Sequence, residues 1–451
     1  MHSSLRSSCV LLSLLCGVPG LLAQTSSGSP RVDRILSQLT LAEKIQLIHG
    51  EHEGPETDQG QAGYWPGLPE KGIPSLRMAD GPPGVLTQYP STAPTSTMGL
   101  AATFSREDAN ANGAVVAKDA KALGIDVILQ PFVNIERDFT WHRGYDTYGE
   151  DPLLSGAIGA AFIQGAQAQG TMAQAKHYIG YDGPAINVFI PAQALHEIYL
   201  EPFAAAVNAG VSSVMCGYNK INGAFACGNN HLLNTVLRGE LGFKGFVDSD
   251  WGATHGTEFL KLGLDLEMPS VSKGVTSRTY FRPDAGQPRA TGKSVGFTPS
   301  RGIPEEWGAK RPTSPRPDDP ISIGMTAALR DGVVTPADVE RAAGRILVQM
   351  ERFGLLDNPP SHKPGAVPRE EDWRVVQKTS EDAAVLLKND GILPLKPADL
   401  KKLAVIGPGG GQTIAVGISG EKALGFPAQQ ISPLAALQAM TTSKIAFAVA
   451  N

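Results

Sequence analysis

A chain of 451 residues exceeds the size of one ordinary domain and predicts two or three. Its hydrophobic share of 42% and charged share of 18% are typical of a globular protein and exclude a disordered one. The formal net charge of −5 is small for this length, so neither a nucleic acid nor an anionic membrane is expected as a partner.

The first 23 residues have the organisation of a signal peptide. Arg6 gives a positive start, residues 10–18 form an apolar stretch, and Ala23 precedes a polar Gln24, so we expect cleavage after Ala23. The apolar stretch is too short to span a bilayer. We therefore expect an exported protein, either periplasmic or extracellular.

Two of the four cysteines lie in the predicted signal peptide, which leaves Cys216 and Cys227. A remaining pair in an exported protein indicates a disulfide. Such a bond across a short loop would stabilise the fold by roughly 3 kcal/mol in the chain-entropy model. Two buried free thiols are the alternative.

Short apolar runs alternate with helical patterns along most of the chain. Thr40 marks a cap between two N-terminal helices. Strands are then predicted over 125–135, 171–181, 212–219 and 245–250, and helices over 155–170, 195–210 and 231–242. This alternation predicts βαβ units with a parallel sheet. Its repetition over roughly 250 residues favours a (β/α)8-type, TIM-like barrel over an open sheet.

Residues 270–320 interrupt this pattern. They are rich in proline and glycine and poor in aliphatic side chains, which predicts an irregular insertion on the barrel surface with little share in the core. The barrel is expected to span residues 24–357. A proline-rich linker over 358–372 follows, and residues 373–451 are interpreted as the first part of a second α/β sandwich domain, incomplete at residue 451.

Polar and aromatic residues gather at the predicted carboxyl ends of the strands, where the active site of a parallel barrel lies. The residues at these ends are Asp80, Arg143, Lys176, His177, Met215, Tyr218, Asp250 and Trp251. The positive groups are expected to lower the pKa of Asp250 and keep it ionised. No glycine-rich anion cradle accompanies the set, which therefore favours a sugar ligand over a phosphate.

These residues also have purely structural explanations. Asp250 can be the N-cap of a following helix, because aspartate accepts hydrogen bonds from free N–H groups there. Lys176 and His177 can belong to a buried ion-paired set, and Met215 and Tyr218 can be core residues. The gathering of so many polar side chains at strand ends favours the catalytic interpretation.

Several motifs resemble those of family 3 glycoside hydrolases. In order they are "ADGPPGV", "WHRGYDTYGEDP", "KHYIG", "VMCGYNKING", "GFVDSDW" and "AVLLKNDGILPL". The resemblance covers roughly residues 32–440 apart from the insertion, and it is to the β-glucosidase branch. It implies a retaining exo-glycosidase that removes terminal non-reducing β-D-glucosyl residues from oligosaccharides or glucosides, with no metal or organic cofactor.

The resemblance also implies roles for individual residues. Asp250 matches the nucleophile that forms a covalent glycosyl-enzyme. The positions that would bind or enclose the terminal sugar are Asp80, Arg143, Lys176, His177, Met215, Tyr218 and Trp251. No acid/base residue is assigned, because that residue is expected beyond residue 451. Asp146 stands where the family usually has Glu, and Gln193 where it often has Arg.

Other functions fit parts of the same pattern. A β-xylosidase or arabinosidase of the same family would use the same motifs for a pentose. A truncated chain that binds sugar with little turnover is a second alternative. A barrel lyase or aldolase would use Lys176 as a Schiff-base nucleophile, and reductive trapping of a lysine adduct would identify it.

Overall fold

The computed structural model describes residues 26–269, 281, 324–367, 370–396, 402–412, 416–417, 422–423 and 431–449. The predicted signal peptide lies outside the described residues. Within the described ranges, no helix is long and apolar enough to cross a membrane.

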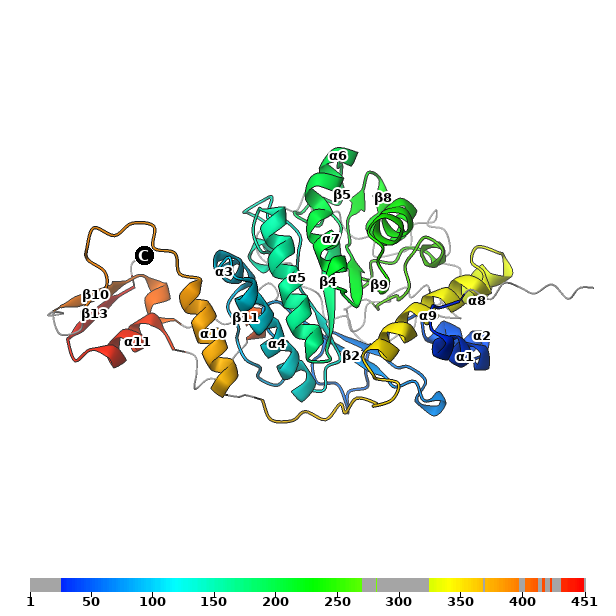
Figure 1. Ribbon diagram of the computed structural model, residues 1–451, viewed down its shortest axis with the longest axis horizontal. Coiled ribbons are helices and arrows are strands. Elements are labelled where there is room, and N and C mark those ends of the chain that lie inside the picture. The colour runs from blue at the N-terminus through cyan, green and yellow to red at the C-terminus, as the bar shows by residue number, and fades with distance from the viewer. Residues whose placement is uncertain are drawn as a thin grey trace, which may run out of the picture.

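The centre of the molecule is a curled six-stranded sheet in the order β1-β2-β3-β4-β6-β9 (Figure 1). Its strands are β1 Gly63–Trp65, β2 Leu76–Asp80, β3 Val127–Leu129, β4 Met172–Tyr178, β6 Ser213–Cys216 and β9 Phe246–Ser249. β1 is antiparallel to β2, and the other neighbours are parallel. β3, β4, β6 and β9 are buried along their whole length, as expected for strands enclosed on both faces.

Two short segments close the curled sheet into a ring. Residues 266–267 bridge in parallel to Asp248 of β9 and to His49, and Glu51 then pairs with Tyr64 of β1. Six strands and two bridged segments thus complete a barrel with one antiparallel member. The predicted TIM-like barrel is confirmed in this form.

Helices cover the outside of the ring (Figure 1). They are α1 Pro30–Gln38, α2 Leu41–Gln46, α3 Thr97–Ala102, α4 Arg106–Ala122, α5 Pro152–Ala168, α6 Ala192–Ala194, the π-helix η3 Leu195–Tyr199, α7 Glu201–Asn208, the π-helix η5 His231–Glu240, α8 Met325–Arg330 and α9 Pro336–Arg352. α5 packs between α4 and α7, and α9 packs against α1, α2 and β9. The predicted cap Thr40 is confirmed, since it forms a capping box with Glu43 at the start of α2.

A disulfide joins Cys216 at the end of β6 to Cys227, as predicted. It closes the loop that carries Tyr218, one of the predicted site residues. A small three-stranded sheet braces the same region and consists of β5 Asn187–Val188, β7 Lys220–Ile221 and β8 Ala224–Phe225. The disulfide therefore holds both ends of this loop together at the end of β6, the strand that pairs with β9.

Phe281 is the one described residue between 270 and 323. Its side chain is 0% exposed in the hydrophobic core, and its N–H donates to Oε2 of Glu267 at 2.6 Å. The expectation that 270–320 contributes little to the core is wrong at this position, because a lone aromatic in a polar stretch has no periodicity that could reveal it. The rest of the predicted insertion lies outside the described residues.

Replacing Phe281 with alanine should lower the free energy of unfolding by about 3–5 kcal/mol, the usual loss for a fully buried phenylalanine. Chemical denaturation of the two proteins measures the difference. Phe139→Ala is the matched control, because Phe139 is 93% exposed and its loss should change stability by less than about 0.5 kcal/mol. Equal stability of the two variants would contradict a core role for Phe281.

α10 Glu370–Asp382 packs against α3 and α4 of the barrel. Lys118 Nζ lies 2.8 Å from Oδ1 of Asp372, and Asn112 Nδ2 donates to Oγ1 of Thr379 at 2.8 Å. This helix is therefore attached to the barrel, although its sequence was assigned mostly to the second domain.

A second α/β unit follows α10 (Figure 1). Its described elements are β10 Leu403–Ile406, η8 Pro408–Gly411, α11 Pro433–Met440 and β13 Ile445–Ala448. β11 Val416–Gly417 and β12 Lys422–Ala423 form a separate antiparallel pair. β10 and β13 are parallel neighbours, and α11 lies between them in the sequence. This βαβ order is typical of α/β domains.

Candidate active site

The carboxyl ends of four parallel strands bring the predicted site residues together. Asp80 ends β2, Lys176 and His177 lie near the end of β4, and Asp250 directly follows β9. β6 runs between β4 and β9, and it places Met215 beside both Lys176 and Asp248 in register. The site therefore lies at the end of the barrel that the sequence indicated.

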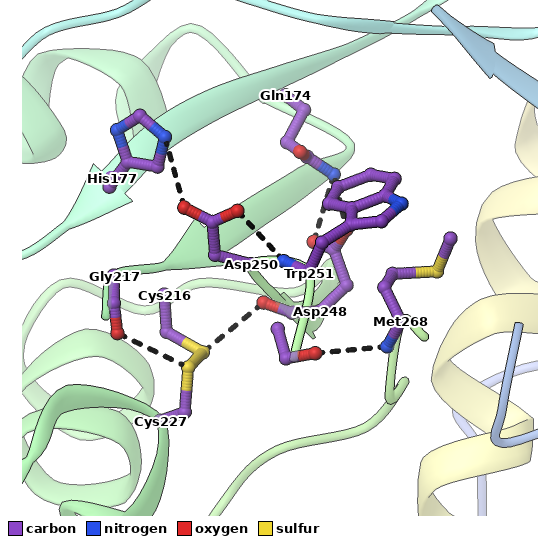
Figure 2. Close-up of a disulfide and its surroundings, with 10 residues drawn as sticks. Gln174, His177, Cys216, Gly217, Cys227, Asp248, Asp250, Trp251 and Met268 are labelled. Atoms are coloured by element: carbon purple, nitrogen blue, oxygen red, sulfur yellow. Dashed lines mark hydrogen bonds and ion pairs between the residues drawn. A yellow bond between two sulfur atoms is a disulfide. The ribbon is translucent and has the colours of Figure 1, made fainter. Parts of the chain in front are cut away.

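Asp250 is nearly enclosed, with 6% of its surface exposed. Its Oδ1 accepts a hydrogen bond from the N–H of Trp251 at 2.8 Å, and the nearby hydroxyl of Tyr218 stabilises its charged form. Nε2 of His177 lies 3.4 Å from Oδ2 (Figure 2). No helix begins at Asp250, so the alternative that it is a helix N-cap is wrong.

Burial raises the pKa of Asp250 above its ordinary value. The hydroxyl of Tyr218, the charge of Arg143 and the N–H of Trp251 each act in the opposite direction, but their combined effect is smaller. The expectation that positive neighbours lower this pKa is therefore wrong in sign. Removal of water from the carboxylate outweighs the attraction of the cations.

His177 is held as a neutral imidazole beside Asp250. Burial lowers its pKa well below the ordinary value, and the charges of Arg143 and Lys176 lower it further. The backbone around the ring is fixed by Asn134, whose Oδ1 accepts from His177 N at 2.7 Å and whose Nδ2 donates to His177 O at 2.9 Å. Contact between His177 and Asp250 is therefore not an ion pair at neutral pH.

Lys176 is buried and lies 3.7 Å from Oδ1 of Asp80, measured from its Nζ. Burial lowers the pKa of Lys176, and the carboxylate of Asp80 opposes this shift. The ladder between β4 and β6 shifts in register between Lys176 and Tyr178. Irregularities of this kind redirect side chains next to active sites, and here consecutive residues both reach the site.

Arg143 lies on a loop after β3 and is tied to Asp146, with Nε donating to Oδ2 at 3.1 Å. Its guanidinium also lies 4.7 Å from the centre of the Phe132 ring. Asp146 therefore reaches Arg143 despite being shorter than the glutamate common in the family. Gln193 is exposed and donates to the carboxylate of Glu197 on the helical segment that follows.

An aromatic wall beside His177 was missed from the sequence. The ring centre of Tyr181 lies 5.0 Å from that of His177, 5.3 Å from that of Trp141 and 6.0 Å from that of Tyr218. Burial raises the pKa of Tyr181, and the nearby charge of Arg143 opposes this shift. Its position at the end of the predicted strand 171–181 is the signal that could have identified it.

Trp251 and Met215 are both packed into the barrel. The indole Nε1 of Trp251 donates to Ala62 O at 2.9 Å, and a Cβ added at Gly63 would meet the indole ring at 2.7 Å. Glycine at position 63 therefore lets β1 approach the tryptophan closely. Met215 is 1% exposed and belongs to the hydrophobic core, in agreement with the structural alternative for it.

Several buried polar atoms at this end of the barrel have no hydrogen-bond partner within the described ranges. They are Oδ2 of Asp250, Nδ1 of His177, Nη2 of Arg143 and Oδ1 of Asp146. The set contains donors and acceptors side by side, which matches hydroxyl groups that can both donate and accept. Tyr218, 39% exposed, lies where the site meets solvent.

Comparisons with known proteins agree with this geometry. Residues 68–265 match the model of the glycosyl hydrolase family 3 N terminal domain. The chain is 32% identical over 391 residues to a β-glucosidase of Rhizobium radiobacter, and 32% identical over 392 residues to β-glucosidase B of Emericella nidulans. Each alignment covers 84% of this chain but only 41% and 40% of the relatives, so the chain spans less than half of their length.

Solved structures of β-glucosidases also match the fold of this chain. The fold matches DesR, a β-glucosidase from Streptomyces venezuelae in complex with D-glucose, with a TM-score of 0.76 and 33% identity over 93% of this chain and 50% of that one. It also matches β-glucosidase 3B from Thermotoga neapolitana in complex with α-D-glucose, with a TM-score of 0.73 and 29% identity over 92% of this chain and 55% of that one. The chain therefore belongs to glycosyl hydrolase family 3, as a β-glucosidase-like member that carries the family's N-terminal domain.

Proposed function

We propose that this protein is a retaining exo-β-glucosidase with Asp250 as its nucleophile. The observation that carries the proposal is Oδ2 of Asp250, which is buried, accepts no hydrogen bond from the described residues and lies 3.4 Å from Nε2 of the neutral His177. An oxygen so placed keeps its lone pairs available for attack on an anomeric carbon. Glucose in the two matched structures supports a glucosyl group as the ligand.

The reaction proceeds in two displacements. In the first, the carboxylate of Asp250 forms a bond to the anomeric carbon while the bond to the leaving oxygen breaks, and a general acid protonates that oxygen. In the second, water attacks the same carbon, its proton passes to the conjugate base of that acid, and the ester to Asp250 breaks. Each displacement inverts the configuration of the anomeric carbon, so the released sugar has the same configuration as the substrate.

The surrounding residues bind the sugar. Asp80 is the acceptor for sugar hydroxyls, while Lys176 donates to them from a buried position and Arg143 from a partly buried one. Binding through charged partners discriminates strongly against sugars that lack a hydroxyl, because the buried groups are then left unpaired. Hydroxyl recognition of this kind favours a terminal, non-reducing residue.

We also propose that the protein acts outside the cytoplasm. The Cys216–Cys227 disulfide supports this location, because disulfides persist mainly in oxidising compartments. The organisation of the first 23 residues as a signal peptide supports it independently.

Proton NMR of an aryl β-D-glucoside during hydrolysis tests the proposed reaction. β-D-glucose should appear first, and the α anomer should follow only by mutarotation. Initial release of the α anomer would contradict a retaining mechanism. Parallel assays with β-xyloside and arabinoside test the pentose alternative, which a higher kcat/KM on either pentoside would favour.

A further inference from the structure

One fully buried carboxyl group of the barrel has no role in the proposed mechanism. Asp248 lies two residues before Asp250 on β9, and its side chain is inaccessible to solvent. Gln174 of β4 reaches it, with Nε2 2.8 Å from Oδ1 and 2.9 Å from Oδ2 (Figure 2). Side chains two positions apart on a strand share a face, so this pair lies in the interior layer next to that of Lys176 and Asp250.

The surroundings of Asp248 do not neutralise a negative charge. Within the described ranges, no lysine, arginine or histidine forms an ion pair with it, and Lys176 is paired with Asp80 instead. The titratable groups on the strands around it are Lys176, His177 and Tyr178 on β4, Asp250 directly after β9, and Asp265 and Glu267 beside the bridging Leu266. β6 contributes Ser213 and Met215 in this region, and neither titrates.

Gln174 supplies an independent observation. Its Nε2 also donates to Oγ of Ser213 at 3.1 Å, while its buried Oε1 receives no hydrogen bond from the part of the chain that the structure describes. A carboxylate has only acceptors and cannot satisfy that oxygen, whereas a carboxylic acid has an O–H to donate. When the amide is turned by half a rotation, Oε1 takes the position 2.8 and 2.9 Å from the two carboxyl oxygens, where a neutral acid can donate its O–H to it.

We propose that Asp248 keeps its proton in the folded protein and forms a neutral acid–amide pair with Gln174 that positions the nucleophile, a role that rests on the proposed function of Asp250. Burial raises the pKa of Asp248 well above its ordinary value, which supports the protonated form. Because the Asp248–Gln174 pair is neutral, it does not repel the carboxylate of Asp250 in the next layer. Lys176 is then free to interact with Asp80 and the substrate instead of with Asp248.

Infrared difference spectroscopy of the unmodified protein against Asp248→Asn at pH 7 tests the protonation directly. The carbonyl stretch of a carboxylic acid should disappear in the variant. Loss of the carboxylate stretches instead would overturn the proposal. This readout does not depend on turnover, so it is separate from the failure or success of Asp250 as nucleophile.

The acid limb of the pH profile of kcat/KM tests the link to Asp250. Gln174→Glu gives two carboxyl groups that share one proton, which adds a negative charge to the layer and should move the limb to higher pH. Asp248→Asn keeps the layer neutral and should leave the limb where it is. If Asp248→Asn moves the acid limb to lower pH, Asp248 is ionised in the unmodified protein. If Gln174→Glu leaves the acid limb unmoved, the pair of Asp248 and Gln174 does not position Asp250.

Thermal unfolding gives a readout even if Gln174→Glu does not fold. Above about pH 3.9 the unfolded chain releases the proton of Asp248 whereas the folded chain retains it, so this group destabilises the fold increasingly as pH rises. Asp248→Asn removes the effect. The Tm of the variant relative to the unmodified protein should therefore increase from pH 4 to pH 7, and a constant difference would contradict the proposal.

Discussion

Replacing Asp250 with alanine should lower kcat for aryl β-glucosides by a factor on the order of 10⁴ or more, because removal of a nucleophile abolishes the covalent route and leaves only binding and electrostatic effects. The fold should survive, since the side chain lies at a strand end and makes few contacts. Asp331→Asn is the matched control, because Asp331 is an exposed surface carboxylate that pairs with its neighbour Arg330. It should retain full activity.

Covalent labelling identifies the nucleophile independently of rate. A 2-fluoroglucoside with a good leaving group should accumulate an ester on Asp250, because fluorine slows hydrolysis of the intermediate. Peptide mapping locates the label. A tag on any other residue, Asp80 included, would show that the nucleophile is misassigned.

The pH dependence of the same step follows from the raised pKa of Asp250. Attack requires the carboxylate, so kcat/KM should fall as pH decreases through this pKa. The acid limb should lie above about 3.9, the ordinary aspartate value. A limb at or below that value would mean that the cations outweigh burial after all.

The second large effect is expected at Asp80. Hydrogen bonds to charged groups contribute about 1.5–3 kcal/mol, so Asp80→Asn should lower kcat/KM for the glucoside by roughly 10- to 150-fold. Loss of the anion also leaves buried Lys176 without its partner 3.7 Å away. The larger end of the range is therefore expected.

Deoxy substrates separate recognition from general damage. For the unmodified protein, removal of the hydroxyl bound by Asp80 should lower kcat/KM strongly, and in Asp80→Asn the same removal should have much less effect. Such non-additivity is the signature of a direct contact. Equal penalties for every deoxy glucoside in both proteins would place Asp80 outside the sugar site.

Much of the barrel and of its site was predictable from the sequence, because strand ends in a parallel barrel are marked by an abrupt change from apolar to polar residues. Asp250 and Lys176 were found in this way. Tyr181 and Asp248 were not, since Tyr181 is an aromatic residue without a charge to mark it at the end of the predicted strand 171–181, and Asp248 is a polar residue within a buried strand. The sign of the Asp250 pKa shift was also beyond the sequence, because it depends on how completely water is excluded.

Closure of the barrel also has a consequence for how the chain is made. The pairing of His49 with Glu267 joins segments from the two ends of the barrel sequence, so the ring has a high contact order. On a ribosome that adds about 5–20 residues per second, the segment around His49 waits roughly 10–45 s before its partner has been synthesised. Until that partner is made, the segment around His49 remains the unpaired edge of the growing sheet, and an unpaired edge is the form most exposed to aggregation.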